Sequence, residues 1–147
     1  MSIGAGYAEI IAERKNAGYK NLEDPDNPEW TIYIARTHVI DHETGIEARG
    51  PLKIGRGKYM NNIQRGRNQG GGDFRVYARL IFENNNGTKK TESYIEKNYK
   101  NRKFVGPQST QSELYDFKDY EIEQIIKDIT SWAPTVGVKI TSVKVYI

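Results

Sequence analysis

The chain has 147 residues, no cysteine and no long hydrophobic run. Without cysteine it cannot form a disulfide or bind zinc through thiolates, which favours an intracellular or virion setting over a secreted one. No apolar stretch approaches the roughly 18 to 20 residues that a membrane-spanning helix needs. The first 20 residues lack the basic start and apolar stretch of a secretory signal. We therefore expect a protein of the host cytoplasm or nucleus, or of a virus particle, with no membrane partner.

The composition is otherwise that of an ordinary globular protein, with 37% hydrophobic and 28% charged residues. The length suits one domain with a single modest core. A polar segment containing Pro25 and Pro28 reads as a linker. We expect an N-terminal extension and linker over residues 1–28 and a core over 29–117. A C-terminal helix and strand over 118–147 would belong to the same domain.

Positive charge is concentrated in two segments, although the net charge is only +3. Residues 48–72 and 97–112 contain no acidic residue. If both segments fold onto one face, they form a patch suited to phosphates. The charge pattern alone fits two solvated faces equally well. The basic residues of the two segments are Arg49, Lys53, Arg56, Lys58, Arg65, Arg67, Lys97, Lys100, Arg102 and Lys103.

Hydrophobic periodicity predicts alternating helices and strands. Alternation is clearest in FRVYARLIFE, where Phe74, Val76, Ala78, Leu80 and Phe82 are expected on one face. Residues 37–50 read as an extended turn, NNNG at 84–87 as a tight turn, and a bulge is expected near Thr141. The predicted helices cover residues 1–20, 59–67, 88–102 and 116–129, and the predicted strands cover 30–36, 51–55, 74–83 and 136–147. This order predicts a compact α/β (α+β) layer that starts with an antiparallel hairpin.

The predicted hairpin places a phenol beside an ammonium group. Tyr33 lies in the middle of the first strand, and Lys53 lies two residues before Gly55 in the second. A cation next to a phenol favours the phenolate, which can accept a proton from water. Gly55 would allow a substrate or backbone to approach closely.

An arginine and a glutamate further along the chain complete a possible phosphodiester site. Arg65, or Arg67 as the alternative, could hold phosphate oxygens with the two parallel hydrogen bonds of a guanidinium group. Glu92, expected in the first turn of its helix, is a carboxylate of the kind that holds Mg²⁺ together with water. Each residue alone has an ordinary explanation in packing, helix dipole or surface exposure. The hypothesis therefore depends on their joint order.

That order resembles the GIY-YIG nuclease superfamily, and most closely its branch in phages and large DNA viruses with a KIG second motif. The matching elements are TIY at 31–33, KIG at 53–55, an arginine on the next helix, and the Glu92-x-x-Ile95 and Glu113-Leu-Tyr segments. The resemblance implies a GIY-YIG-like small mixed or antiparallel sheet flanked by helices, with N- and C-terminal extensions. Thr31, Lys53 and Glu96 replace a glycine, a tyrosine and a histidine of the family pattern.

The resemblance also implies a function: a metal-dependent endonuclease that hydrolyses DNA phosphodiester bonds. Tyr33, Lys53 and Arg65 would be catalytic, and Glu92 would hold one Mg²⁺ or Mn²⁺ ion. Further DNA contacts are expected from Arg56, Lys58, Arg67, Lys97 and Arg102. The departures from the family pattern leave an alternative, a catalytically inactive module that acts as a nucleic-acid-binding or structural virion protein. Its terminal extensions would then contact a protein partner.

Two histidines form a separate candidate. His38 and His42, in HVIDH, have the i, i+4 spacing of zinc ligands on a helix. The segment is predicted to be a strand end and loop, and no third ligand is evident. Solvent-exposed loop residues are therefore the favoured interpretation.

Overall fold

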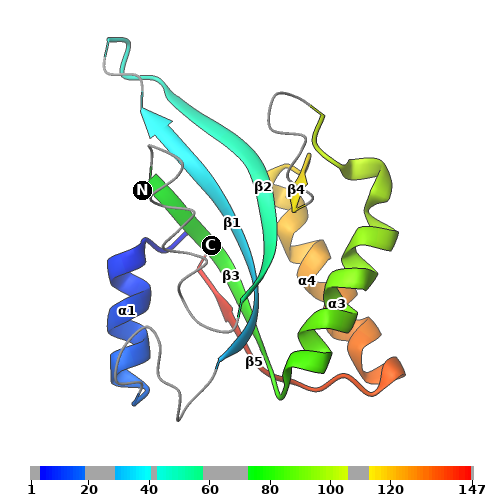
Figure 1. Ribbon diagram of the computed structural model, residues 1–147. Helices are drawn as coiled ribbons and strands as arrows, with labels where there is room; N and C mark the ends of the chain where they lie inside the picture. Colours follow the sequence, from blue (N-terminus) through cyan, green and yellow to red (C-terminus); the bar gives the residue numbers. More distant parts are fainter. Residues whose placement is uncertain (1–3, 19–28, 41–42, 58–72, 106–112, 147) are drawn as a thin grey trace.

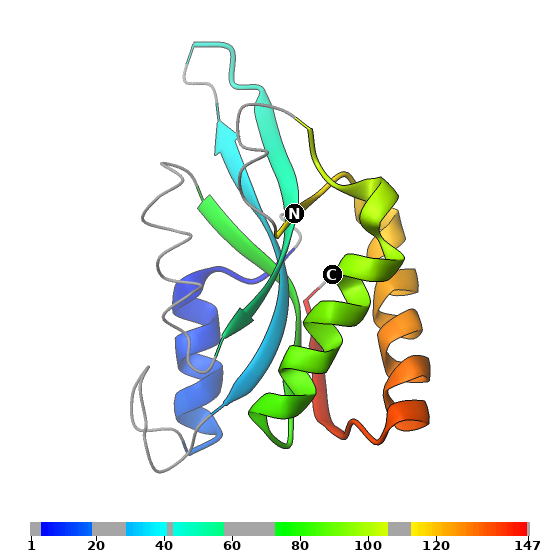
Figure 2. The ribbon, with the colours of Figure 1, turned by 45° about the vertical axis from the view of Figure 1, so that its right-hand side comes forward.

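The protein folds around one antiparallel sheet in an α+β arrangement. A computed structural model describes residues 4–18, 29–40, 43–57, 73–105 and 113–146. In this part of the chain five strands follow the order β4-β2-β1-β3-β5, with α1 on one face and α3 and α4 on the other (Figures 1 and 2). The elements are α1 (Tyr7–Asn16), β1 (Trp30–Ile40), β2 (Glu47–Gly57), β3 (Asp73–Phe82), α3 (Asn85–Asn98), β4 (Leu114–Tyr115), α4 (Ile122–Trp132) and β5 (Ile140–Val145), with short 3₁₀ segments at Lys100–Arg102, Asp119–Glu121 and Ala133–Val136.

The predicted hairpin is confirmed, but its strands are longer than expected. β1 continues to Ile40 and β2 already begins at Glu47, so the prediction of an extended turn over residues 37–50 was wrong. Pairing slips between Arg36 and His38, opposite Pro51. A proline has no N–H to donate to a ladder, and a bulge is one of the few places where a strand accepts it.

The third strand changes face along its length. Its pairing with β1 slips at Tyr77, because Ile34 pairs with Ala78 while Ala35 pairs with Val76. Phe74 and Val76 therefore pack on the α1 side, while Ala78, Leu80 and Phe82 pack against α3 and α4. The expectation that all five share one face was wrong. The bulge predicted near Thr141 is confirmed, since Ile81 pairs with Ser142 and Phe82 with Ile140.

Helix α3 begins earlier than predicted, within the NNNG segment that had suggested a turn. The Asn84 side chain accepts a hydrogen bond from the Gly87 N–H at 2.9 Å, which caps the helix. Glu92 consequently lies in the middle of α3 rather than in its first turn. Strand β4 was not predicted at all; it pairs with Leu52 and Lys53 of β2 and is only 2 residues long.

A buried ionic network holds α1 against the sheet. The Arg79 guanidinium pairs with Glu29 and, at 2.9 Å, with Glu13, while Arg14 pairs with Glu29 at 3.1 Å. The Tyr146 hydroxyl donates to Glu13 at 2.8 Å, and the Gly4 N–H donates to the Tyr146 carbonyl at 2.8 Å. Segments near both ends of the chain therefore meet on this face. None of the described helices has the length and apolar character of a membrane span.

Candidate functional site

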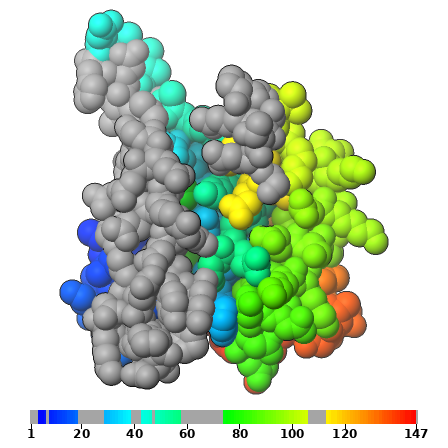
Figure 3. Space-filling view, in the orientation of Figure 1, coloured from blue at the N-terminus to red at the C-terminus, as the bar shows by residue number. Residues whose placement is uncertain are grey.

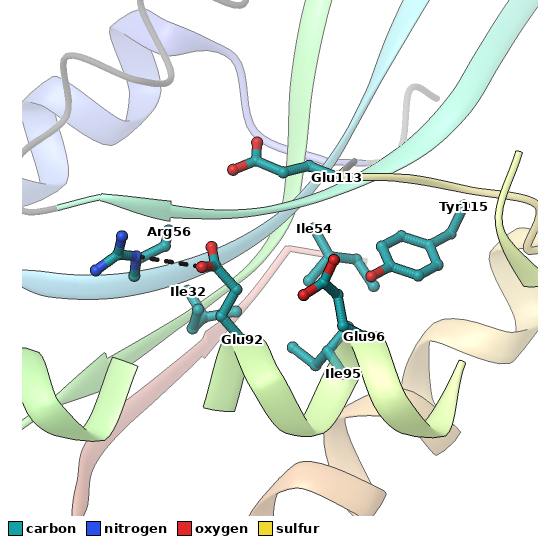
Figure 4. A pocket seen from close by; sticks show the side chains of 8 residues that line it. All are labelled: Ile32, Ile54, Arg56, Glu92, Ile95, Glu96, Glu113 and Tyr115. Carbon is teal, nitrogen blue, oxygen red and sulfur yellow. Dashed lines mark ion pairs between the residues drawn. The ribbon is translucent and has the colours of Figure 1, made fainter. Parts of the chain in front are cut away.

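A small pocket of about 210 Å³ opens where the middle of α3 meets the edge of β2 (Figure 4). β4 pairs with Leu52 and Lys53, and the Ile54 N–H donates to the Glu113 carbonyl at 3.0 Å, so Glu113 lies beside this part of β2. The pocket floor is apolar and its rim is charged. It is lined by Ile32, Ile54, Arg56, Glu92, Ile95, Glu96, Glu113 and Tyr115.

Three carboxylates of this pocket form ion pairs with three different cations. The Arg56 Nε lies 3.6 Å from Glu92, the Lys53 Nζ lies 3.8 Å from Glu113, and Lys103 lies 3.6 Å from Glu96. These pairs are long and partly exposed, so each contributes little to stability and can be exchanged for a ligand at small cost.

The Glu113 carboxylate pairs with Lys53 and also feels the charges of the Arg56–Glu92 pair. Burial raises the pKa of the Glu113 carboxyl, and the charge of Glu92 raises it further, while Lys53 and Arg56 act in the opposite direction. Lys53 and Glu92 therefore both lie within electrostatic reach of one carboxylate. In Figure 4 Glu92 and Glu96 extend from α3 toward β2, and Glu113 lies across the β2 ribbon from them.

Tyr33 and Lys53 share the other face of the hairpin. Tyr33 pairs with Gly55 and Lys53 with Ala35, so both side chains point to the side on which α1 packs. The Tyr33 ring contacts Phe74 edge-on and is only 2% exposed. Its hydroxyl lies over Gly55, where an added Cβ would be 2.5 Å from the Tyr33 Cζ. Glycine at position 55 is thus what leaves room for the phenol.

The structure does not place Tyr33 and Glu92 in the same pocket. Glu92 lines the pocket with Ile32 and Ile54, on the α3 side of the sheet, whereas Tyr33 packs on the α1 side. The Tyr33 phenol and the Glu92 carboxylate, which the predicted phosphodiester site would need side by side, therefore lie on opposite faces of the sheet. Tyr33 and Glu92 instead approach residues 53–57 of β2 from its two faces, and Glu113, which pairs with Lys53, lies at the strand edge.

The remaining predicted residues differ in their surroundings. Arg65, Arg67 and Lys58 lie outside the described residues. Lys97 is exposed on α3, and Arg56 lines the pocket. Arg102 pairs with Glu121 at 2.7 Å and lies over the Phe117 ring, so its guanidinium already has protein partners.

The histidine candidate is not supported as a metal site. His38 belongs to β1, is buried, and hydrogen-bonds through Nε2 to the Tyr77 hydroxyl. It is a core residue, so the interpretation as an exposed loop residue was wrong for His38. His42 lies outside the described residues.

The carboxylates of the pocket fit a divalent ion only in a water-rich form. Among the described residues, no three histidine, cysteine, aspartate or glutamate side chains are arranged to hold a metal. Mg²⁺ needs only one or two carboxylates when it keeps most of its water. Glu92, which is partly exposed, fits that requirement.

Sequence reasoning missed part of this pocket. Glu96 and Glu113 were noted only as letters of a motif, and Tyr115 was given no role. β4 is too short to produce a periodic signal, so nothing indicated that Glu113 would lie beside Lys53. Comparisons with protein families, with characterised proteins and with solved structures gave no match.

Proposed function

We propose that this protein is a metal-dependent endonuclease that hydrolyses DNA phosphodiester bonds at the edge of β2. One observation carries the proposal: Glu113 pairs with Lys53 at 3.8 Å and lines the same pocket as Glu92, although the three residues are far apart in the chain. The position of the Tyr33 hydroxyl over Gly55, between Lys53 and Arg56 along β2, also supports it.

Each residue has a role in this proposal. Arg56 would exchange its long ion pair with Glu92 for a charge-assisted hydrogen bond to a non-bridging phosphate oxygen. Such a hydrogen bond is shorter and stronger than the ion pair that it replaces. Lys53 would favour the phenolate of Tyr33 on the same face of the hairpin, and a movement that uncovers this buried phenol at the edge of β2 would let it accept the proton of the attacking water. Glu92 would hold Mg²⁺ or Mn²⁺, and the bound ion would polarise the phosphate.

A plasmid-nicking assay with Mg²⁺ or Mn²⁺ tests the proposal. Glu92→Gln is expected to abolish nicking, because a neutral amide is a poor ligand for these ions. Glu123→Gln, which removes an exposed carboxylate from α4, is the matched control and should cut like the wild type. Equal cutting by wild type and Glu92→Gln would contradict the assigned role.

A second candidate is a nucleic-acid-binding or structural module without catalysis, for example in a virus particle. It is favoured by the 2% exposure of Tyr33 and by its separation from the Glu92 pocket. Its expected result is no nicking by any variant, with no effect of Glu92→Gln on DNA binding. Tight association with another protein through the terminal segments, measured in the same preparations, would indicate the structural form of this role.

A further inference from the structure

A second recess lies between α3 and the end of α4, away from the Glu92 pocket. It has a volume of about 580 Å³ and is open to solvent. In the space-filling view α3 forms the surface on this side, and the segment at the end of α4 lies beside it (Figure 3). The recess is lined by Lys90, Ser93, Tyr94, Lys97, Asn98, Trp132 and Val136.

Two stacked aromatic rings form the apolar part of this recess. The Tyr94 and Trp132 ring centroids are 4.3 Å apart and the rings are nearly parallel, at 15°. Both side chains are only partly buried, although both also contact the main core. Burial and the nearby Asp128 raise the pKa of Tyr94, so its phenol stays neutral near pH 7.

Two lysines supply positive charge on the same side. Lys90 and Lys97 are two helical turns apart on α3, hence about 10 Å along its axis, and both are exposed. The described lining includes no carboxylate. Asp128, whose charge acts on Tyr94, accepts hydrogen bonds from Tyr99 at 2.8 Å and Gln124 at 2.7 Å.

We propose that this recess binds an unpaired stretch of single-stranded nucleic acid. A base stacks on the Tyr94–Trp132 pair, and neighbouring phosphates contact Lys90 and Lys97. Flat aromatic rings beside exposed lysines are the combination that holds single strands with little sequence preference. Exposed lysines beside flat rings favour nucleic acid, which supplies both phosphates and bases. The proposal is independent of catalysis, because none of these residues lines the Glu92 pocket.

Binding is measured without divalent ions, so that cleavage plays no part. The probe is a fluorescent oligo-dT of about 12 nucleotides, a length within the 4 to 16 that one small domain covers, with a duplex of equal length as comparison. The wild type is expected to bind the single strand more tightly. Binding should quench the emission of Trp132, which a Trp132→Phe variant identifies because the chain contains only one other tryptophan, Trp30.

The variants separate specific binding from charge. Lys90→Gln with Lys97→Gln should weaken binding about tenfold and lower the salt dependence by about 0.7 per lost phosphate contact. Lys127→Gln with Lys139→Gln removes the same charge from exposed positions outside the recess and should have a smaller effect. Equal losses for the two pairs, or binding without tryptophan quenching, would overturn the proposal. Loss of oligo-dT binding in Tyr94→Ala, with thermal unfolding still cooperative, would support it.

Discussion

At Gly55 a missing side chain determines where the Tyr33 phenol lies. The ring fills the space that a β-carbon at position 55 would occupy. Gly55 has no positive φ, so its role is to leave space and not to provide unusual backbone freedom. The contact between Gly55 and Tyr33 also matters for the proposed reaction, because it holds the phenol hydroxyl over β2, the strand that carries Lys53 and Arg56.

Gly55→Ala is expected to reduce the free energy of unfolding by about 1–3 kcal/mol, the usual cost of overpacking a buried site. The Tyr33 ring is buried and contacts Phe74 edge-on, so it has little space to move away. Gly50→Ala in the same strand is the control, since its Cβ would be 3.7 Å from the nearest atom. Urea unfolding measures both variants. Equal stability of the two would contradict this explanation of Gly55.

Glu113 predicts a pH dependence of stability. Its pKa is raised in the folded protein, chiefly by burial. A raised carboxyl pKa stabilises the fold below the ordinary pKa, and this contribution is lost as the pH rises through the raised value. Glu113→Gln should therefore gain stability relative to the wild type as the pH increases over that window.

Thermal unfolding at a series of pH values from about 4 to 8 measures this difference. The difference in Tm between Glu113→Gln and the wild type should become more positive as the pH rises. A constant difference would show that the carboxyl titrates alike in the folded and unfolded chain. Glu123→Gln, on the exposed side of α4, controls for the loss of one surface charge.

At the scale of elements, sequence patterns located most helices and strands. They missed the bulge at which β3 changes face and the residue at which α3 begins. Nothing in the sequence marks the bulge of β3, because Tyr77 is itself apolar and the flanking alternation is unbroken. Three consecutive asparagines favour a turn as strongly as a helix cap, so the start of α3 was misplaced. The bulge at Thr141 was predictable because the alternation itself slips there.

The attachment of α1 depends on Glu29, which pairs with Arg14 and Arg79 and is 2% exposed. Glu29→Gln should lower the free energy of unfolding by about 3–5 kcal/mol, because it leaves buried guanidinium charge without its partner. Glu9→Gln breaks a long pair with Arg75 near the surface and should change stability by less than about 0.5 kcal/mol. Chemical denaturation compares them, and similar losses would contradict the importance of the buried network.

For the whole molecule, the sequence predicted which residues lie on the hairpin. It did not predict that Tyr33 and Glu92 lie on opposite faces of the sheet. The motif order correctly placed Tyr33, Lys53 and Gly55 on paired strands. The face occupied by Glu92 follows from how α3 packs against Ile32 and Ile54, which are long-range contacts without a local signal. The same holds for Glu113, whose position depends on pairing between β4 and β2.

The contacts between Gly4, Glu13 and Tyr146 join residues from opposite ends of the described chain. During synthesis on a ribosome, α1 emerges early but cannot complete these contacts until Tyr146 has been added. Closing such a distant pairing is slow compared with forming a helix. The ionic network around Arg79 can form earlier, but the attachment of α1 is complete only when translation has passed the final strand.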